Sequence, residues 1–330
     1  MKGRTHVGGV ALGMLLSAAA VAPATVDAQG PDGRWPLQPR TGVGRVVAPF
    51  LEGWYPNEDG TISYSFGYLN MNEETIEIPI GEGNMIEPAE YNGMQPTVFL
   101  RGRHRGMFAV TVPASMREAD IWWTITNPDG EVTRVPGRTK WSAYMLDWIP
   151  RPHGSVPPEV AFDGGQAPNG LGPARGVPGV IANTRVSATV GAPTTLSVNI
   201  RDLSVRDPAD PRFREPTSLR VVWTKHQGPV GENVEFTRHE STPIQPAGRG
   251  GRGRGGGGGG GGGGDGDAAA AESAETILVP EGQGTVRVVA TFSQPGDYLI
   301  NAQVDNWRSP DSGSGDQCCW SNGYVRVTVR

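Results

Sequence analysis

Residues 286–304 read VRVVATFSQPGDYLINAQV, and this stretch decides the fold class of the chain. β-Branched and aromatic residues fill 286–292 and 298–304, which is the composition of two strands. Between them, Gln294-Pro295-Gly296-Asp297 carries the residues of a tight turn. Tyr298 opens the later strand, where β-sandwiches often place a tyrosine whose hydroxyl bonds back to the preceding corner. The stretch therefore predicts two strands of a β-sandwich.

Five more segments with strand composition surround it, at 186–190, 195–200, 219–225, 234–238 and 324–329. No window of the chain repeats apolar residues at helical spacing over three turns. Seven short strands with turn signals between them are typical of the immunoglobulin-like sandwich. We therefore predict such a domain over residues 184–330.

An earlier region, residues 45–149, has the same character. Aromatic and aliphatic side chains at 62, 64, 66 and 68 alternate with Ser63, Ser65 and Gly67, the period of a half-buried strand. Trp122 and Trp123 are adjacent in another predicted strand, so they should face opposite sides: one in the core, the other on the surface or covered by the neighbouring domain. With roughly seven such strands, this region predicts a first β-sandwich.

Two segments lack any apolar period. Residues 150–183 are rich in proline and glycine and predict a linker. Residues 245–275 include ten consecutive glycines at 255–264, which have too much backbone entropy to order without a partner. The predicted fold is all-β: two immunoglobulin-like sandwiches joined by a Pro/Gly-rich linker, with a disordered Gly-rich insertion in the second.

The first 28 residues resemble an export signal. Lys2 and Arg4 precede an apolar run at 10–21, and Val26 and Ala28 stand at the small-residue positions of a cleavage site. The apolar run is shorter than the ~20 residues that span a bilayer, and no later stretch is long enough. We expect an exported bacterial protein, periplasmic, extracellular or at the cell surface, with no transmembrane segment after cleavage. The net charge of -5 argues against a nucleic-acid partner.

Two resemblances extend this interpretation. The first is carried by Glu52-Gly53-Trp54-Tyr55, Asn57, Asp59-Gly60-Thr61, Ser65-Phe66-Gly67-Tyr68, Asn70, Asn72, Ile78-Pro79-Ile80-Gly81, Gln95-Pro96-Thr97, Phe99, Arg103 and Phe108-x-Val110-x-Val112-Pro113. This pattern resembles a recurrent family of exported bacterial proteins, and it implies homology and export but no activity. The second, Ala290-Thr291-Phe292-Ser293 with Pro295-Gly296 and Tyr298, is similar to the end of a PKD or related immunoglobulin-like extracellular module. It implies a fold rather than a function.

No catalytic motif is present in the sequence. The G-x-S-x-G, H-E-x-x-H and P-loop patterns are absent, so we expect no enzymatic activity. Asp305, Asp311 and Asp316 share one predicted loop, where oxygen ligands can bind calcium. Ordinary turn chemistry explains the same aspartates, since Asp bonds its own backbone in turns. We therefore predict no cofactor and keep calcium as the alternative.

The only two cysteines, Cys318 and Cys319, are adjacent and lie in the predicted loop 305–322 with Trp307 and Trp320. Adjacent Cα atoms stand closer than ordinary disulfides prefer, so a Cys318–Cys319 bond would be strained. Two free thiols or a bridge between chains are the alternatives. The oxidising compartment favours the bond. We predict a ligand-binding tip formed by Trp307, Cys318, Cys319 and Trp320.

Together these features favour an exported, non-enzymatic binding or adhesion protein, whose partner is a protein or glycan at the cell surface. One alternative is a structural subunit of a cell-surface assembly, in which sheet edges of different copies pair. Self-association is compatible with that alternative. An exported hydrolase, or its accessory module, is the second alternative.

Overall fold

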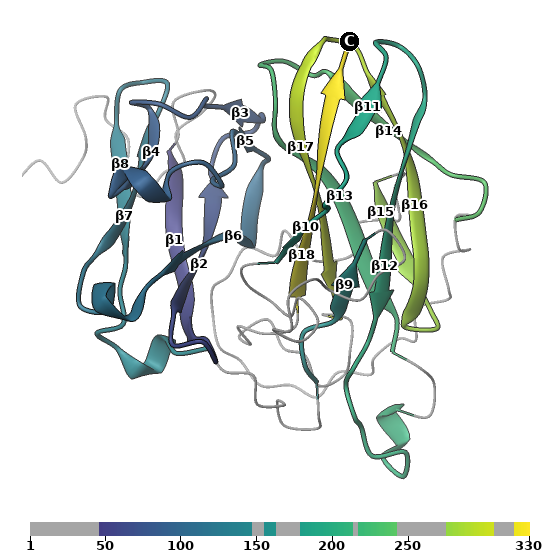
Figure 1. The fold of residues 1–330 in the computed structure, drawn as a ribbon, viewed down its shortest axis with the longest axis horizontal. Coiled ribbons are helices and arrows are strands. Elements are labelled where there is room, and N and C mark those ends of the chain that lie inside the picture. The colour runs from purple at the N-terminus through teal and green to yellow at the C-terminus, as the bar shows by residue number, and fades with distance from the viewer. Residues whose placement is uncertain (1–45, 147–154, 163–178, 214–216, 243–274, 307–319) are drawn as a thin grey trace, which may run out of the picture. The chain divides into compact units, whose positions relative to one another are not determined.

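The structure is a computed structural model, and it describes residues 46–146, 155–162, 179–213, 217–242, 275–306 and 320–330. In these residues the chain is all-β, with four single-turn 3-10 helices at Ala89–Tyr91, Ala114–Met116, Ser142–Tyr144 and Pro211–Phe213 (Figure 1). None of the described helices is long and apolar enough to cross a membrane. The predicted signal segment 1–28 and residues 245–274 of the predicted Gly-rich insertion lie outside the described residues.

The first sandwich occupies 46–146. One sheet has the order β1-β2-β6, formed by Val47–Pro56, Ile62–Asn70 and Gly102–Val112. The other has the order β4-β7-β8, formed by Asn84–Glu87, Ile121–Thr126 and Val132–Gly137. A short pair, β3 (Ile76–Glu77) and β5 (Val98–Phe99), completes it.

Aromatic side chains fill the core between these sheets. The rings of Phe66 and Phe108 stack with centroids 5.4 Å apart, and Trp123 meets Phe108 edge-on at 4.9 Å. Trp122 is only partly buried, and the guanidinium of Arg134 lies 4.0 Å from its ring centroid. The prediction that the adjacent tryptophans face opposite sides is therefore confirmed, because successive strand residues alternate between faces.

The second sandwich has the sheet order of an immunoglobulin-like domain. One sheet runs β10-β18-β17-β13-β15, formed by Val180–Ile181, Trp320–Val329, Gly296–Asp305, Leu219–Gln227 and Thr276–Val279. The short strand β11 (Val186–Ala188) also pairs with β18, in parallel. The other sheet runs β14-β16-β12-β9, formed by Val234–Arg238, Gln283–Phe292, Thr194–Arg201 and Glu159–Ala161.

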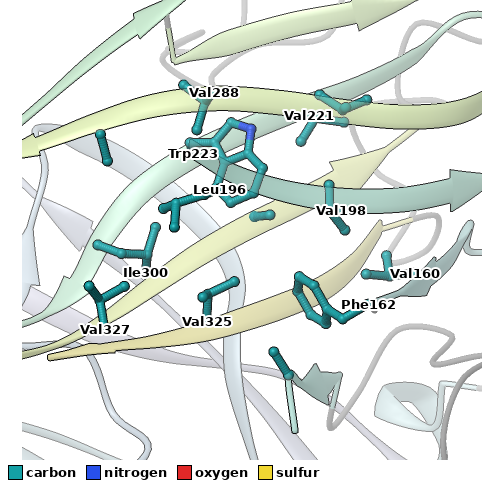
Figure 2. Close-up of a cluster of buried hydrophobic side chains, with 14 of the residues drawn as sticks. Val160, Phe162, Leu196, Val198, Val221, Trp223, Val288, Ile300, Val325 and Val327 are labelled. Carbon is teal, nitrogen blue, oxygen red and sulfur yellow. The ribbon is translucent and has the colours of Figure 1, made fainter. Parts of the chain in front are cut away.

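Two hallmarks of that fold are present. Trp223 on β13 is fully buried between the sheets, and Figure 2 shows its indole among Leu196, Val221 and Val288. Tyr298 donates its hydroxyl hydrogen to the carbonyl oxygen of Gln294 over 2.8 Å. The tyrosine corner predicted from the sequence is therefore confirmed.

Parts of the segment predicted to be a linker are strands of the second sandwich. β9 pairs with β12, and β10 pairs with β18 (Figure 1). Val160 is fully buried, and Phe162 is 9% exposed in the same core. The proline-rich context hides these strands from a pattern search, because three or two residues are too short to show an alternation.

Candidate functional site

The loop predicted to form the binding tip has different ends in the structure. β17 extends to Asp305 and β18 begins at Trp320, where these two residues are paired partners. The bounds 305–322 are therefore wrong at both ends, since cross-strand pairing continues through Asp305 and from Trp320 onward. Trp307, Asp311, Asp316, Cys318 and Cys319 lie outside the described residues. The disulfide and most of the predicted ligand site therefore stay predictions.

Trp320 faces the first sandwich. Its side chain is 1% exposed, and a Cβ atom added at Gly106 would lie 1.9 Å from its Nε1 atom. Gly106 has a φ of +54°, in the left-handed region that favours glycine. Trp320 is thus a packing residue in the described structure. The alternation of side chains along β18 sets this direction, which loop reasoning did not consider.

Asp305 is also buried. Its carboxylate is 0% exposed and accepts a hydrogen bond from Nε of Arg220 over 2.9 Å. A charge removed from water needs such a partner. Of the three aspartates in the calcium alternative, Asp305 is already paired with Arg220. Asp311 and Asp316 lie outside the described residues. Among the described residues, no three His, Cys, Asp or Glu side chains gather in a metal-binding group.

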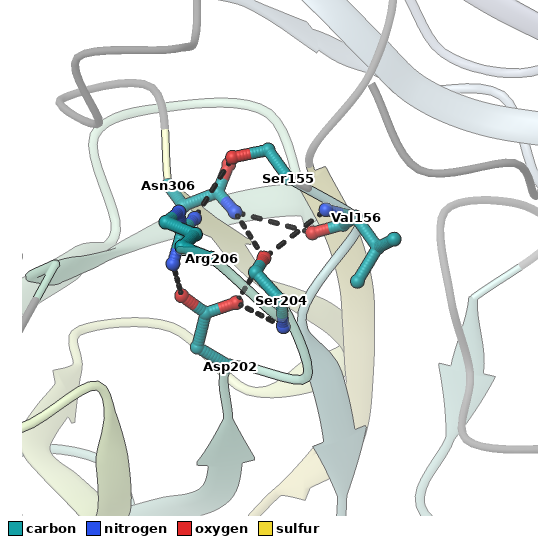
Figure 3. Close-up of polar contacts among 6 residues, drawn as sticks. All are labelled: Ser155, Val156, Asp202, Ser204, Arg206 and Asn306. Atoms are coloured by element: carbon teal, nitrogen blue, oxygen red, sulfur yellow. Dashed lines mark hydrogen bonds and ion pairs between the residues drawn. The ribbon is translucent and has the colours of Figure 1, made fainter. Parts of the chain in front are cut away.

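Hydrogen bonds connect three segments at the end of the second sandwich where β17 ends and β18 begins. They involve five polar side chains and the backbone of Val156. We call these residues the loop-root network: Ser155, Val156, Asp202, Ser204, Arg206 and Asn306 (Figure 3). Asp202 accepts from the backbone N–H of Ser204 over 3.0 Å and pairs with Arg206 over 2.8 Å. The other guanidinium nitrogen of Arg206 donates to Ser155 Oγ over 2.8 Å. The side chains of Asp202 and Arg206 are only 11% and 10% exposed, so this ion pair is largely removed from water.

Asn306 joins the third segment to this network. Its Nδ2 donates to the carbonyl oxygen of Val156 over 3.1 Å, and Ser204 Oγ accepts from the N–H of Val156 over 3.1 Å. The network therefore ties together the chain before β9, the loop after β12 and the residue after β17. The network is not among the features predicted from the sequence, although Asp202-x-Ser204 has the spacing of an aspartate turn.

Backbone carbonyls of β6 contact the second sandwich. The two sandwiches belong to one compact unit, Thr41–Arg330, and we call the contacts between them the joint. Gln303 donates to Arg105 O over 3.0 Å, and Tyr324 donates its hydroxyl to Met107 O over 2.6 Å. Asn322 donates to the carbonyl between them, that of Gly106. Three consecutive carbonyls of an edge strand are thus satisfied by side chains of β17 and β18.

A second group of contacts covers part of β13. The N–H of Thr97 donates to the carbonyl oxygen of His226 over 2.9 Å. Gln227 donates to the carbonyl oxygens of Gly93 and Gln95, both over 2.8 Å. Lys225 pairs with Glu77 over 2.8 Å. The edge of β13 that would otherwise be open to another chain is covered here by the first sandwich.

Glu52 lies beneath the β6 contacts. It is 1% exposed, with an oxygen 2.6 Å from Arg103 and the other 3.7 Å from Arg105. Burial raises the pKa of this carboxyl, and the two arginines oppose that effect. A Cβ atom at Gly67 would lie 2.2 Å from the Glu52 Oε1 atom, so the carboxylate needs glycine there.

Several residues that carry the first resemblance make structural contacts in this chain. Glu52 pairs with Arg103 beside Gly67, and Asn70 donates from Nδ2 to the carbonyls of Glu74 over 2.9 Å and Phe99 over 2.8 Å. Gln95 and Thr97 stand at the edge of β13. In the described residues this pattern therefore contributes to the fold and to the interface between the sandwiches.

No protein-family model matches the chain, and no curated protein matches it. Among solved structures it is similar to the human CEP192 ASH/PapD-like domain 7, at 12% identity and a TM-score of 0.22, covering 58% of this chain and 94% of that one. It is also similar to domains 4 and 5 of the S-layer protein SbsC, at 11% identity and a TM-score of 0.20, covering 88% and 99%. The titin tandem A164-A165 has 11% identity and a TM-score of 0.18, covering 86% and 97%. TM-scores this low carry no argument, so the immunoglobulin-like description rests on sheet order and on Trp223 and Tyr298.

Proposed function

We propose that this chain is an exported, non-enzymatic binding protein that contacts its partner through the end of the second sandwich where the loops after β12 and β17 leave the sheets. The observation that supports this most directly is the loop-root network. In immunoglobulin-like variable domains the loops in these two positions lie at the same end and bind ligands. Here Asp202, Arg206 and Asn306 fix both loop roots with buried hydrogen bonds.

The joint supports the same proposal. A binding loop loses less entropy on association when its base is already held in place. Trp320 is packed on Gly106 at one end of the loop, and Asp305 is paired with Arg220 at the other. The first sandwich then acts as a rigid support, and the partner is a protein or a glycan of the cell surface.

The test compares two loop replacements in the mature chain, on a glycan array and on immobilised cell-surface protein fractions. In one variant residues 307–317 are replaced by a short Gly-Ser segment, which keeps Asp305, Asn306 and Trp320. The matched control replaces the turn 293–295, which connects β16 to β17. We expect the first replacement to abolish binding and the control to retain it.

Binding that survives the 307–317 replacement refutes the proposed surface. Concentration-dependent assembly without any captured ligand, measured by size-exclusion chromatography, would favour the structural subunit of a surface assembly. Turnover of a substrate that disappears on changing one carboxylate or histidine would favour the hydrolase.

A further inference from the structure

The joint encloses a histidine. His226 on β13 is 1% exposed, and its Nε2 atom lies 2.8 Å from the carbonyl oxygen of Met94 in the first sandwich. The ring meets that of Tyr324 at a centroid distance of 5.3 Å. The backbone of the same residue accepts from Thr97. Ring and backbone of His226 therefore both bind the segment 94–97.

The hydrogen bond to Met94 fixes the tautomer of the neutral imidazole. A carbonyl only accepts, so Nε2 must carry the hydrogen, and Nδ1 is the basic nitrogen. Nδ1 is buried and has no hydrogen-bond partner among the described residues. A proton added there would place a charge without an acceptor inside the joint, which is costly. Burial accordingly lowers the pKa of His226 to about 4.

No carboxylate contacts the ring in the described part of the chain. Tyr324 faces it from β18; a tyrosine hydroxyl is neutral in acid, and burial raises its pKa further. Lys225 and Glu77 neutralise each other beside it. Elsewhere in the joint, Glu52 is held by Arg103 and Arg105.

The direction of a pKa shift shows whether protonation of that group strengthens or weakens the joint. The pKa of Glu52 is raised in the folded chain, so the native state binds that proton more tightly and acid does not open the joint through Glu52. The pKa of His226 is lowered, so its contribution is present above about 6.5 and is lost as the pH falls through about 4. Protonation of His226 favours the open joint.

We propose that the joint is an acid-sensitive latch, in which protonation of the enclosed His226 releases the segment 93–97 from β13 while both sandwiches stay folded. The latch then changes how firmly the second sandwich and its loops are held. A fall in pH at the cell surface, or transfer to an acidic compartment, would act on it.

Hydrogen exchange of the mature chain measures this directly. The Thr97 amide bonds only to His226 O across the joint, whereas the Ile78 amide donates to Thr97 O within the first sandwich. With rates corrected for intrinsic exchange, the protection of Thr97 should fall by up to roughly 300-fold between pH 7 and pH 3.5, the ratio that a shift from 6.5 to 4 implies. The protection of Ile78 should change much less.

Two variants test whether His226 causes the acid loss of protection at the Thr97 amide. His226→Gln keeps a donor for Met94 O but cannot be protonated, so the acid loss at Thr97 should disappear. His239→Gln is the matched control: this histidine contacts Ser241 outside the joint, and its replacement should leave the acid loss intact. An acid loss that persists in His226→Gln arises from another group and overturns the proposal, as does constant protection of Thr97 in the unmodified chain. If His226→Gln does not fold, NMR titration of the His226 ring decides, and a midpoint near 6.5 rejects the latch.

Discussion

Replacing Gly106 by alanine tests how tightly the two sandwiches fit. A Cβ atom at this position would lie 1.9 Å from Nε1 and 2.2 Å from Cε2 of Trp320. Both atoms belong to a rigid indole that is 1% exposed, so neither can move without shifting β18 or β6. The substitution therefore forces the joint apart or distorts its edge strand.

Two contributions determine the expected loss of stability in Gly106→Ala: backbone strain and a steric clash. Alanine in the left-handed region costs about 1–2 kcal/mol relative to glycine. Adding a methyl group to a close-packed site costs about 1–3 kcal/mol more, because neighbouring side chains leave their preferred rotamers. Gly60 separates the terms: its φ is +83° and no atom lies within 4 Å of the point that a Cβ would occupy, so Gly60→Ala should show only the backbone cost.

The assay is calorimetric unfolding of the mature chain and of both variants. We expect Gly106→Ala to lower stability by about 1–3 kcal/mol more than Gly60→Ala, the size of the steric term. At about 2–4 °C per kcal/mol for a chain of this size, the two melting temperatures should differ by several degrees. Trp320→Leu in the Gly106→Ala background should recover part of the loss, because leucine lacks the indole atoms that clash. Equal costs for both glycine variants would refute a close-packed joint.

Three further changes test other parts of the structure. Tyr298→Phe removes the hydroxyl bond to Gln294 and should cost about 1 kcal/mol in urea unfolding, whereas no change would discount the tyrosine corner. Trp223→Ala should cost about 3–5 kcal/mol because it empties the core of the second sandwich, and Trp141→Ala, at 55% exposure, should stay within about 0.5 kcal/mol; similar losses would contradict the core assignment. If Cys318 and Cys319 are bonded in the mature chain, its intact mass should be lower than after reduction by the mass of two hydrogens, and labelling of two thiols without reductant would exclude that bond.

The long strands of the second sandwich were predictable because their signals are local. In 286–304, strand composition surrounds a Pro-Gly turn, and β16 and β17 are found there. The short strands β9, β10 and β15 were not predicted. Two to four residues carry no readable period, and they become strands only because a longer neighbour offers unpaired backbone groups.

Some candidate residues could be recognised from the sequence, and others only from the structure. Sequence reasoning pointed to Trp320 and Asp305 as members of an exposed loop, and the structure buries both. It gave no role to Glu52, Arg206 or His226, because each acts through a contact more than 40 positions away in the chain. Such contacts have no signature in the spacing of residues.

By itself, then, the sequence determined the all-β class, the long strands and the tyrosine corner, since alternation and turn chemistry act between neighbours along the chain. Only the tertiary structure decided that Gly106 receives Trp320, that Glu52 is enclosed with two arginines, and that His226 bonds the first sandwich. These features arise where two sheets meet, and their energies depend on desolvation, which exists only once distant segments have packed together.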